Sequence, residues 1–100
     1  MTLKIKVELS PVFQTALQSS NVFIELEENE GTVKELLRHL ARKTGGKINS
    51  LLFEEEGDSI LSGLMVMVNN RVFTGTALNE QMILLRDKDK VSLLYFVSGG

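Results

Sequence analysis

The stretch that decides the fold is TVKELLRHLARKTGG, residues 32–46. Thr32 and Glu35 have the T-x-x-E spacing of a capping box, in which each side chain accepts a hydrogen bond from a backbone N–H left unpaired at the helix start. Gly45-Gly46 follows the last turn, where glycine readily takes the left-handed conformation that ends a helix. An apolar stripe at helical spacing lies between these two ends: Val33, Leu36, Leu37, Leu40 and Ala41. The segment therefore predicts one amphipathic helix with cations, Arg42 and Lys43, in its last turn.

Other segments, on both sides of this helix, have the two-residue period of half-buried strands. They are residues 3–9 (LKIKVEL), 22–27 (VFIELE), 64–68 (LMVMV), 71–73 (RVF) and 91–97 (VSLLYFV). Asn69-Asn70 joins the third and fourth as a two-residue hairpin turn, because asparagine tolerates positive φ. One helix covers only one face of such a sheet. The order predicts a two-layer α+β fold, a mixed sheet with one main helix on one face.

The connecting segments are less regular. Ser10-Pro11 stops the first strand, and residues 12–18 form either a short helical turn or a plain loop. Residues 47–53 suggest a short helical turn, and 54–59 (EEEGDS) an acidic solvated loop. Residues 78–85 are expected to cross over loosely before the polar turn RDKDK. If the first and last strands are neighbours, their pairing ties the two ends of the chain together.

The composition of the chain argues against several classes of function. The chain has 100 residues, enough for one domain, and a net charge of -2 from 11 basic and 13 acidic residues, which argues against a nucleic-acid partner. The absence of cysteine excludes disulfides, thiolate nucleophiles and Cys-ligated metals. No apolar run approaches the ~20 residues of a membrane span, and the N-terminus lacks a signal-peptide core, so we expect a cytoplasmic protein without a membrane partner.

No residue set in the sequence predicts a metal centre or a catalytic site. His39 is the single histidine and is expected to be a plain exposed side chain on the polar helix face. Glu54-Glu55-Glu56 with Asp58 misses the spacing of a calcium loop. No Ser/His/Asp arrangement can be argued from one histidine. We expect no bound cofactor or metal and no catalytic machinery in this chain.

The element order resembles the ubiquitin-like β-grasp fold, and the detail resembles its sulfur-carrier branch, the MoaD/ThiS-like proteins. The nearest likeness is to the small subunit of molybdopterin synthase. Five stretches carry the resemblance: LKIKVEL, TVKELLRHLARKTG, VMVNNRVF, LRDKDKV and the terminal VSGG. Two features depart from the family pattern. Tyr95-Phe96 stands where the family often has two prolines, and residues 47–63 form a longer segment than the smallest members need.

The resemblance implies a β-grasp domain over residues 1–96 and a flexible diglycine tail over 97–100. In the family, an E1-like adenylyltransferase uses ATP to adenylate the terminal carboxylate, and sulfur then replaces the adenylate to give a thiocarboxylate. Gly100 would supply that carboxylate and Gly99 would give clearance, because glycine has no Cβ to obstruct a narrow channel. Val97 and Ser98 would form the tether. The protein would then be the non-catalytic small subunit of molybdopterin synthase, passing sulfur to the large subunit or to another acceptor enzyme.

The last strand also suggests where such enzymes would dock. If Val91, Leu93, Tyr95 and Val97 face the helix, Leu94 and Phe96 face outward. Met65 and Met67 on a neighbouring strand could stand near them, with Phe23 a weaker candidate. An exposed apolar patch usually marks a partner site, and the family docks its enzymes through this face. Coverage of the patch by residues 47–63 or by a second copy is the competing interpretation.

Three other functions remain open at the level of sequence. The sulfur could go to another product, such as the thiazole of thiamine or a tungsten-cofactor precursor. The same carboxyl could form an isopeptide bond to a partner's lysine, as in a ubiquitin-like protein modifier. The diglycine could also be incidental, in a non-covalent interaction module.

Overall fold

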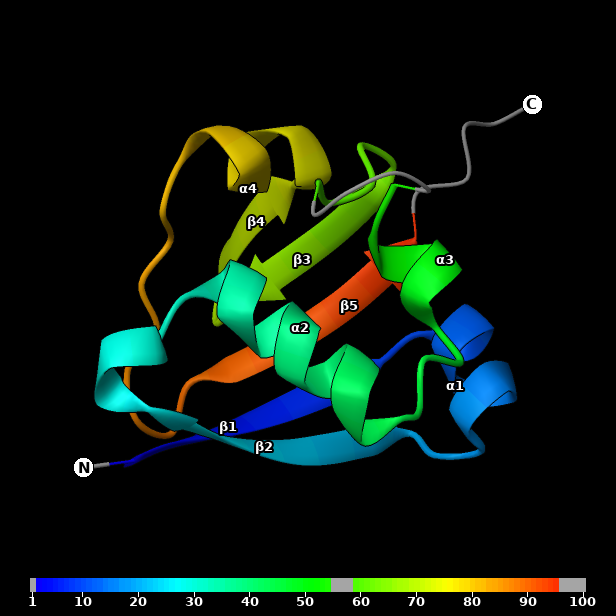
Figure 1. Cartoon of the computed structure of the whole chain (residues 1–100), viewed down its shortest axis with the longest axis horizontal. Coiled ribbons are helices and arrows are strands. Elements are labelled where there is room, and N and C mark those ends of the chain that lie inside the picture. The colour runs from blue at the N-terminus through cyan, green and yellow to red at the C-terminus, as the bar shows by residue number, and fades with distance from the viewer. Residues whose placement is uncertain (1, 55–58, 96–100) are drawn as a thin grey trace.

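The structure is a computed structural model that describes residues 2–54 and 59–95. In this part of the chain, a five-stranded mixed sheet lies behind the main helix, α2 (Figure 1). The strands are β1 (Thr2–Leu9), β2 (Asn21–Glu27), β3 (Leu64–Val68), β4 (Arg71–Thr74) and β5 (Lys90–Tyr95), and their order across the sheet is β2-β1-β5-β3-β4. The helices are α1 (Pro11–Leu17), η1 (Glu28–Glu30), α2 (Val33–Lys43), α3 (Asn49–Leu52) and α4 (Gly75–Glu80). The predicted two-layer α+β arrangement is confirmed.

The first and last strands are neighbours at the centre of the sheet. β1 and β5 run parallel, with Lys6 opposite Lys90 and Leu9 opposite Leu93. β2 pairs with the outer side of β1, and β3 with the outer side of β5, both antiparallel. The pairing of the first and last strands, which the sequence alone could not establish, is therefore present. It joins residues more than eighty positions apart.

Helix α2 forms where the sequence predicts it, with one difference at its start. The Glu35 backbone N–H donates to Thr32 Oγ1 at 3.2 Å, which is half of a capping box. The reciprocal hydrogen bond, from the Thr32 N–H to the Glu35 carboxylate, is replaced by two others. The Thr32 N–H donates to the Glu30 carbonyl at 3.0 Å, and the Glu35 carboxylate accepts from Arg38 at 2.6 Å. Gly45 and Gly46 follow the helix with φ of 69° and 81°, the conformation that favours glycine.

The core lies between α2 and the sheet. Leu36, Leu37 and Leu40 of α2 are fully buried, as are Ile5 and Val7 of β1. These side chains belong to one apolar cluster that also receives Phe13 from α1 and Leu52 from α3. The stripe predicted for the helix and the inward set predicted for the first strand thus meet. Short helices form at α1, where the sequence allowed a helix or a loop, and at α3.

Helix α4 corrects the expectation of a loose crossover from residue 78. The Ala77 N–H donates to Thr74 Oγ1 at 3.1 Å, which caps the helix start. Asn79 then fixes the helix to the preceding segment: its amide nitrogen donates to the Ile60 carbonyl at 2.8 Å, and its oxygen accepts from the Ile60 N–H at 2.9 Å. Neither contact of Asn79 is local in sequence, so periodicity could not have indicated it.

The polar turn before β5 is confirmed and is held by its two aspartates. Asp87 Oδ1 accepts from the Lys4 N–H, and Asp89 Oδ2 accepts from the Arg86 N–H, each at 2.8 Å. Asn69, with φ of 55°, links this turn to the β3–β4 hairpin, because its side chain bonds both Asp89 and the Lys90 N–H at 3.1 Å. Within residues 2–54 and 59–95, no helix combines the length and the apolar character that a bilayer span requires.

Candidate functional site

Strand β5 presents two different faces. Val91 and Leu93 are buried under the helix, whereas Ser92 and Leu94 alternate with them and lie on the open face, both partly exposed. Leu94 stands directly opposite Met65 of β3. The predicted outward position of Leu94 and its proximity to Met65 are therefore observed.

Leu94 lies at one end of an apolar group on the open face. Met65 and Met67 alternate with the buried Leu64, Val66 and Val68 along β3. Val72 of β4 lies opposite Met67 and is 51% exposed. We call Met65, Met67, Val72 and Leu94 the methionine patch. Sequence reasoning missed Val72, although a two-residue turn at Asn69-Asn70 already implies that residues 67 and 72 face each other.

The other half of the open face is charged. Lys4, Lys6 and Glu8 of β1 point outward, and Glu8 pairs with Lys90 of β5 at 3.3 Å. Phe23 of β2 is 63% exposed but stands opposite Lys6, with β1 between it and β5. Phe23 is thus separated from the methionine patch, and the structure does not bring it into the same group.

The remaining predicted site residues are Phe96, Val97, Ser98, Gly99 and Gly100, which lie outside the described residues. β5 is described to Tyr95, one residue before them. The strand that carries Leu94 is therefore the one that leads into this segment.

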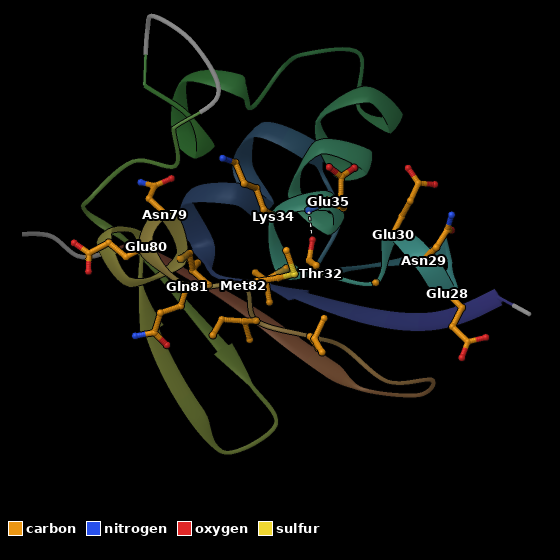
Figure 2. A pocket seen from close by; sticks show the side chains of 15 residues that line it. Glu28, Asn29, Glu30, Thr32, Lys34, Glu35, Asn79, Glu80, Gln81 and Met82 are labelled. Carbon is orange, nitrogen blue, oxygen red and sulfur yellow. Dashed lines mark hydrogen bonds between the residues drawn. The ribbon is translucent and has the colours of Figure 1, made fainter.

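A hollow on another part of the surface was not predicted. It has a volume of about 620 Å³ and lies between two segments, residues 28–35 around the start of α2 and residues 78–84. Figure 2 shows Met82 and Thr32 near its centre, with the carboxylates of Glu28, Glu30 and Glu80 directed outward around it. Met82 and Leu84 are 77% and 70% exposed.

His39 is more buried than expected. It is partly rather than fully exposed, and among the described residues its buried Nε2 has no hydrogen-bond partner. A ligand atom of His39 lies within 4.8 Å of carboxylate oxygens of Glu30 and Glu35, a grouping able to hold a metal ion. Arg38 already neutralises Glu35 at 2.6 Å, however, which weakens the attraction of this group for a cation.

The family is identified by sequence. Residues 13–100 match the sequence profile of the ThiS family, which is most of the chain and includes the final diglycine. The chain belongs to the ThiS family. It is therefore a member of the ubiquitin-like group of sulfur carriers and modifiers. In sequence, it matches none of the curated proteins.

Solved structures similar to this ThiS-family protein share its whole fold. The crystal structure of SAMP1 from Haloferax volcanii has a TM-score of 0.79 at 21% identity, over 97% of this chain and 99% of that one. The putative molybdopterin converting factor subunit 1 from Pyrococcus furiosus has a TM-score of 0.68 at 22% identity, covering 95% and 99% of the two chains. The Amycolatopsis orientalis BexX/CysO complex contributes a match with a TM-score of 0.68 at 21% identity, covering 96% and 99%. The predicted β-grasp fold is confirmed.

Proposed function

We propose that this protein is a sulfur carrier whose reacting group is the carboxylate of Gly100. The observation that carries the proposal is the ThiS-family match, which runs through residue 100 and so includes the VSGG segment that follows β5. Glycine at positions 99 and 100 suits this role, because a chain without Cβ atoms can enter a narrow channel and approach a nucleotide closely.

The chemistry takes place in two steps on a partner enzyme. A carboxylate oxygen of Gly100 attacks the α-phosphorus of ATP, and pyrophosphate leaves, so that an acyl-adenylate is formed. A hydrosulfide ion then attacks the carbonyl carbon, displaces AMP and loses its proton, leaving a thiocarboxylate. ATP binds to the E1-like adenylyltransferase, and this chain contributes the substrate and the surface by which it is held. A cytoplasmic location, shared with the activating enzyme, is part of this proposal.

The methionine patch is the proposed docking surface for that enzyme and for the sulfur acceptor. Its three strands form one side of the open face, and Leu94 lies two residues before the segment 96–100, which starts at Phe96 and carries the diglycine. Methionine side chains adapt to differently shaped partners, which suits a surface that must bind two enzymes in turn. The similarity to a putative molybdopterin converting factor subunit favours molybdopterin as the destination, with the synthase large subunit as acceptor.

Intact-mass measurement tests the carrier chemistry. The protein is incubated with an E1-like adenylyltransferase, ATP and a sulfur source. The expected product has one oxygen replaced by sulfur, and it is absent when Gly100 is deleted. An unchanged mass with an enzyme that activates other ThiS-family proteins would refute the proposal.

A pair of matched variants tests the docking surface. Leu94→Glu adds a charge inside the methionine patch, and Phe23→Glu adds the same charge on the same open face, beyond β1. We expect Leu94→Glu to lower the rate of adenylation at least about tenfold, because it replaces an apolar contact next to the reacting tail with a charge. Phe23→Glu should leave the rate unchanged, and equal effects of the two variants would contradict the assignment.

The alternative is a protein modifier, which would use the same carboxyl group to form an isopeptide bond with a partner's lysine. The similarity to structures of small archaeal modifier protein 1 favours this candidate specifically. Conjugates of high mass that survive denaturation, and that disappear on deletion of Gly100, would identify the modifier. Sulfur exchange in the free protein without such conjugates would identify the carrier.

A further inference from the structure

Residues 82–85 form a short extended segment that, among the described residues, is paired on one side only. The Val33 N–H donates to the Ile83 carbonyl at 3.0 Å, and the Leu85 N–H donates to the Gly31 carbonyl at 2.7 Å. Thr32 and Leu84 form the antiparallel bridge between these two bonds. Figure 1 shows this segment running from α4 past the beginning of α2, along the margin of the molecule.

The other side of the segment is a backbone edge that pairs with none of the described residues. In an extended chain, the N–H and C=O groups of successive residues point in opposite directions. Because Ile83 and Leu85 bond to residues 31–33, the backbone groups of Met82 and Leu84 point away from them. Within the described part of the chain, no backbone hydrogen bond engages Met82 or Leu84. Exposed edges of this kind are templates for pairing with another strand.

The side chains on this edge are unusually apolar for a surface. Leu85 is buried and Ile83 packs against the core, which anchors the segment. Met82 and Leu84, which alternate with them, are 77% and 70% exposed. Exposed edges in soluble proteins usually carry charged residues or proline, which discourage pairing. This edge carries two large apolar side chains, as a docking edge would.

The acidic charge beside this edge indicates which kind of partner would bind there. Among the described residues that line the adjoining hollow, the carboxylates of Glu28, Glu30 and Glu80 outnumber the single cation of Lys34. The charge of a fourth carboxylate, Glu35, is compensated by Arg38. A second copy of this chain would bring one acidic margin against another, which opposes self-pairing. A partner segment with lysine or arginine would instead be attracted.

We propose that residues 82–84 form an edge strand that accepts an extended segment of a partner protein carrying alternating apolar and basic residues. Main-chain hydrogen bonds to Met82 and Leu84 supply the pairing, their side chains contact the apolar residues, and the glutamates contact the cations. This site lies beside the first turn of α2, whereas the methionine patch is on the open face of the sheet. Binding here does not depend on Gly100 or on the sulfur chemistry.

The test uses a defined probe, the capped peptide acetyl-GKVKVRVKVG-amide, titrated into the full ¹⁵N-labelled chain. We expect amide shifts at residues 28–31, 82 and 84, together with slower solvent exchange of the Met82 and Leu84 amides. An acidic peptide with glutamate at every basic position should not bind. A basic peptide with alternate backbone nitrogens methylated should bind at least about tenfold more weakly, because it lacks donors for the edge.

Two variants complete the test. The double variant Met82→Ser/Leu84→Ser should weaken binding of the basic peptide at least about tenfold, while Phe23→Ser removes a similarly exposed apolar group elsewhere and should change it less than about twofold. Three results would overturn the proposal: no binding by the basic peptide, amide shifts confined to the methionine patch, or equal affinity of the methylated peptide. A concentration-dependent dimer that protects the Met82 and Leu84 amides without peptide would also overturn it, since the occupant would then be a second copy.

Discussion

Substitution of Gly75 by alanine should destabilise the fold sharply. Gly75 is buried at the first position of α4, against the backbone of the segment that precedes β3. A Cβ added there would lie 1.7 Å from the Leu61 carbonyl oxygen, 2.7 Å from the Leu61 carbonyl carbon and 3.2 Å from Ser62 Cα. These atoms are backbone, so no side-chain rotation can relieve the overlap.

The size of the effect follows from that geometry. The Leu61 carbonyl would have to move by more than 1 Å to reach even the shortest tolerated contact of 3.0 Å. It is restrained, because the Leu61 N–H donates to the Leu52 carbonyl at 2.9 Å and its own carbonyl accepts from the Leu64 N–H at 3.1 Å. Overpacking against such a neighbour costs about 3 kcal/mol. For a domain of this size, each 1 kcal/mol lowers Tm by roughly 4–8 °C, so we expect a loss of at least about 12 °C.

Thermal unfolding followed by circular dichroism, with a urea titration, measures this loss. Gly45→Ala is the control, because no heavy atom lies within 4 Å of the added methyl group and only the φ of 69° opposes it. That conformation costs alanine about 1 kcal/mol. A Gly75→Ala protein that melts within a few degrees of the wild type, or above Gly45→Ala, would refute the close approach of α4 to Leu61.

Three smaller changes test the other parts of the scaffold. Thr32→Ala removes the cap of α2 and should lower the free energy of unfolding by about 1 kcal/mol in a urea titration; a loss below about 0.3 kcal/mol would mean that the cap contributes little. Asn69→Ala removes two side-chain hydrogen bonds at a residue with φ of 55° and should lower the free energy of unfolding by about 2–3 kcal/mol. Asn69→Gly loses the same two bonds but tolerates the positive φ, so it should lower the free energy of unfolding by less. Glu8→Gln breaks the exposed pair with Lys90 and should cost less than about 1 kcal/mol, a difference that disappears in 1 M salt; a larger or salt-independent loss would contradict a screened surface pair.

The elements that sequence predicted correctly are those set by local periodicity. Helix α2 has five apolar positions on one stripe, and β1 alternates over its whole length, so burial of one face selects a single conformation for each. The same alternation correctly predicts that the methionines of β3 lie on the outward face. These patterns can be interpreted without knowing which element packs against them, because any apolar surface can bury the apolar face.

The elements that sequence missed are held by distant contacts. Helix α4 has only two buried positions, Gly75 and Leu78, which is too few to give a period. Its stability comes from Asn79 bonding to Ile60, nineteen residues away, and from the close approach of Gly75 to Leu61. The exposed edge at Met82 and Leu84 was missed for a related reason, because its extended form depends on Gly31 and Val33.

His39 shows the limit of a helical-wheel argument. The wheel places it beside the apolar stripe of α2, and sequence reasoning treated that margin as solvent. The margin is partly covered, and the ring Nε2 is buried. Whether a residue at the edge of a stripe is exposed depends on neighbouring segments, here including η1 with Glu30, whose carboxylate lies near the ring. No single-helix pattern contains that information.

The register of β5 in the sheet determines which of its side chains lie on the proposed docking surface. Leu93 stands opposite Leu9 on one side and Val66 on the other, and all three are buried, so Leu94 must face outward beside Met65. A shift of one residue would bury Leu94 and expose Val91 and Leu93, since successive side chains alternate between the faces. The buried residues of the core therefore determine which side chains of β5 lie on the open face, in the methionine patch.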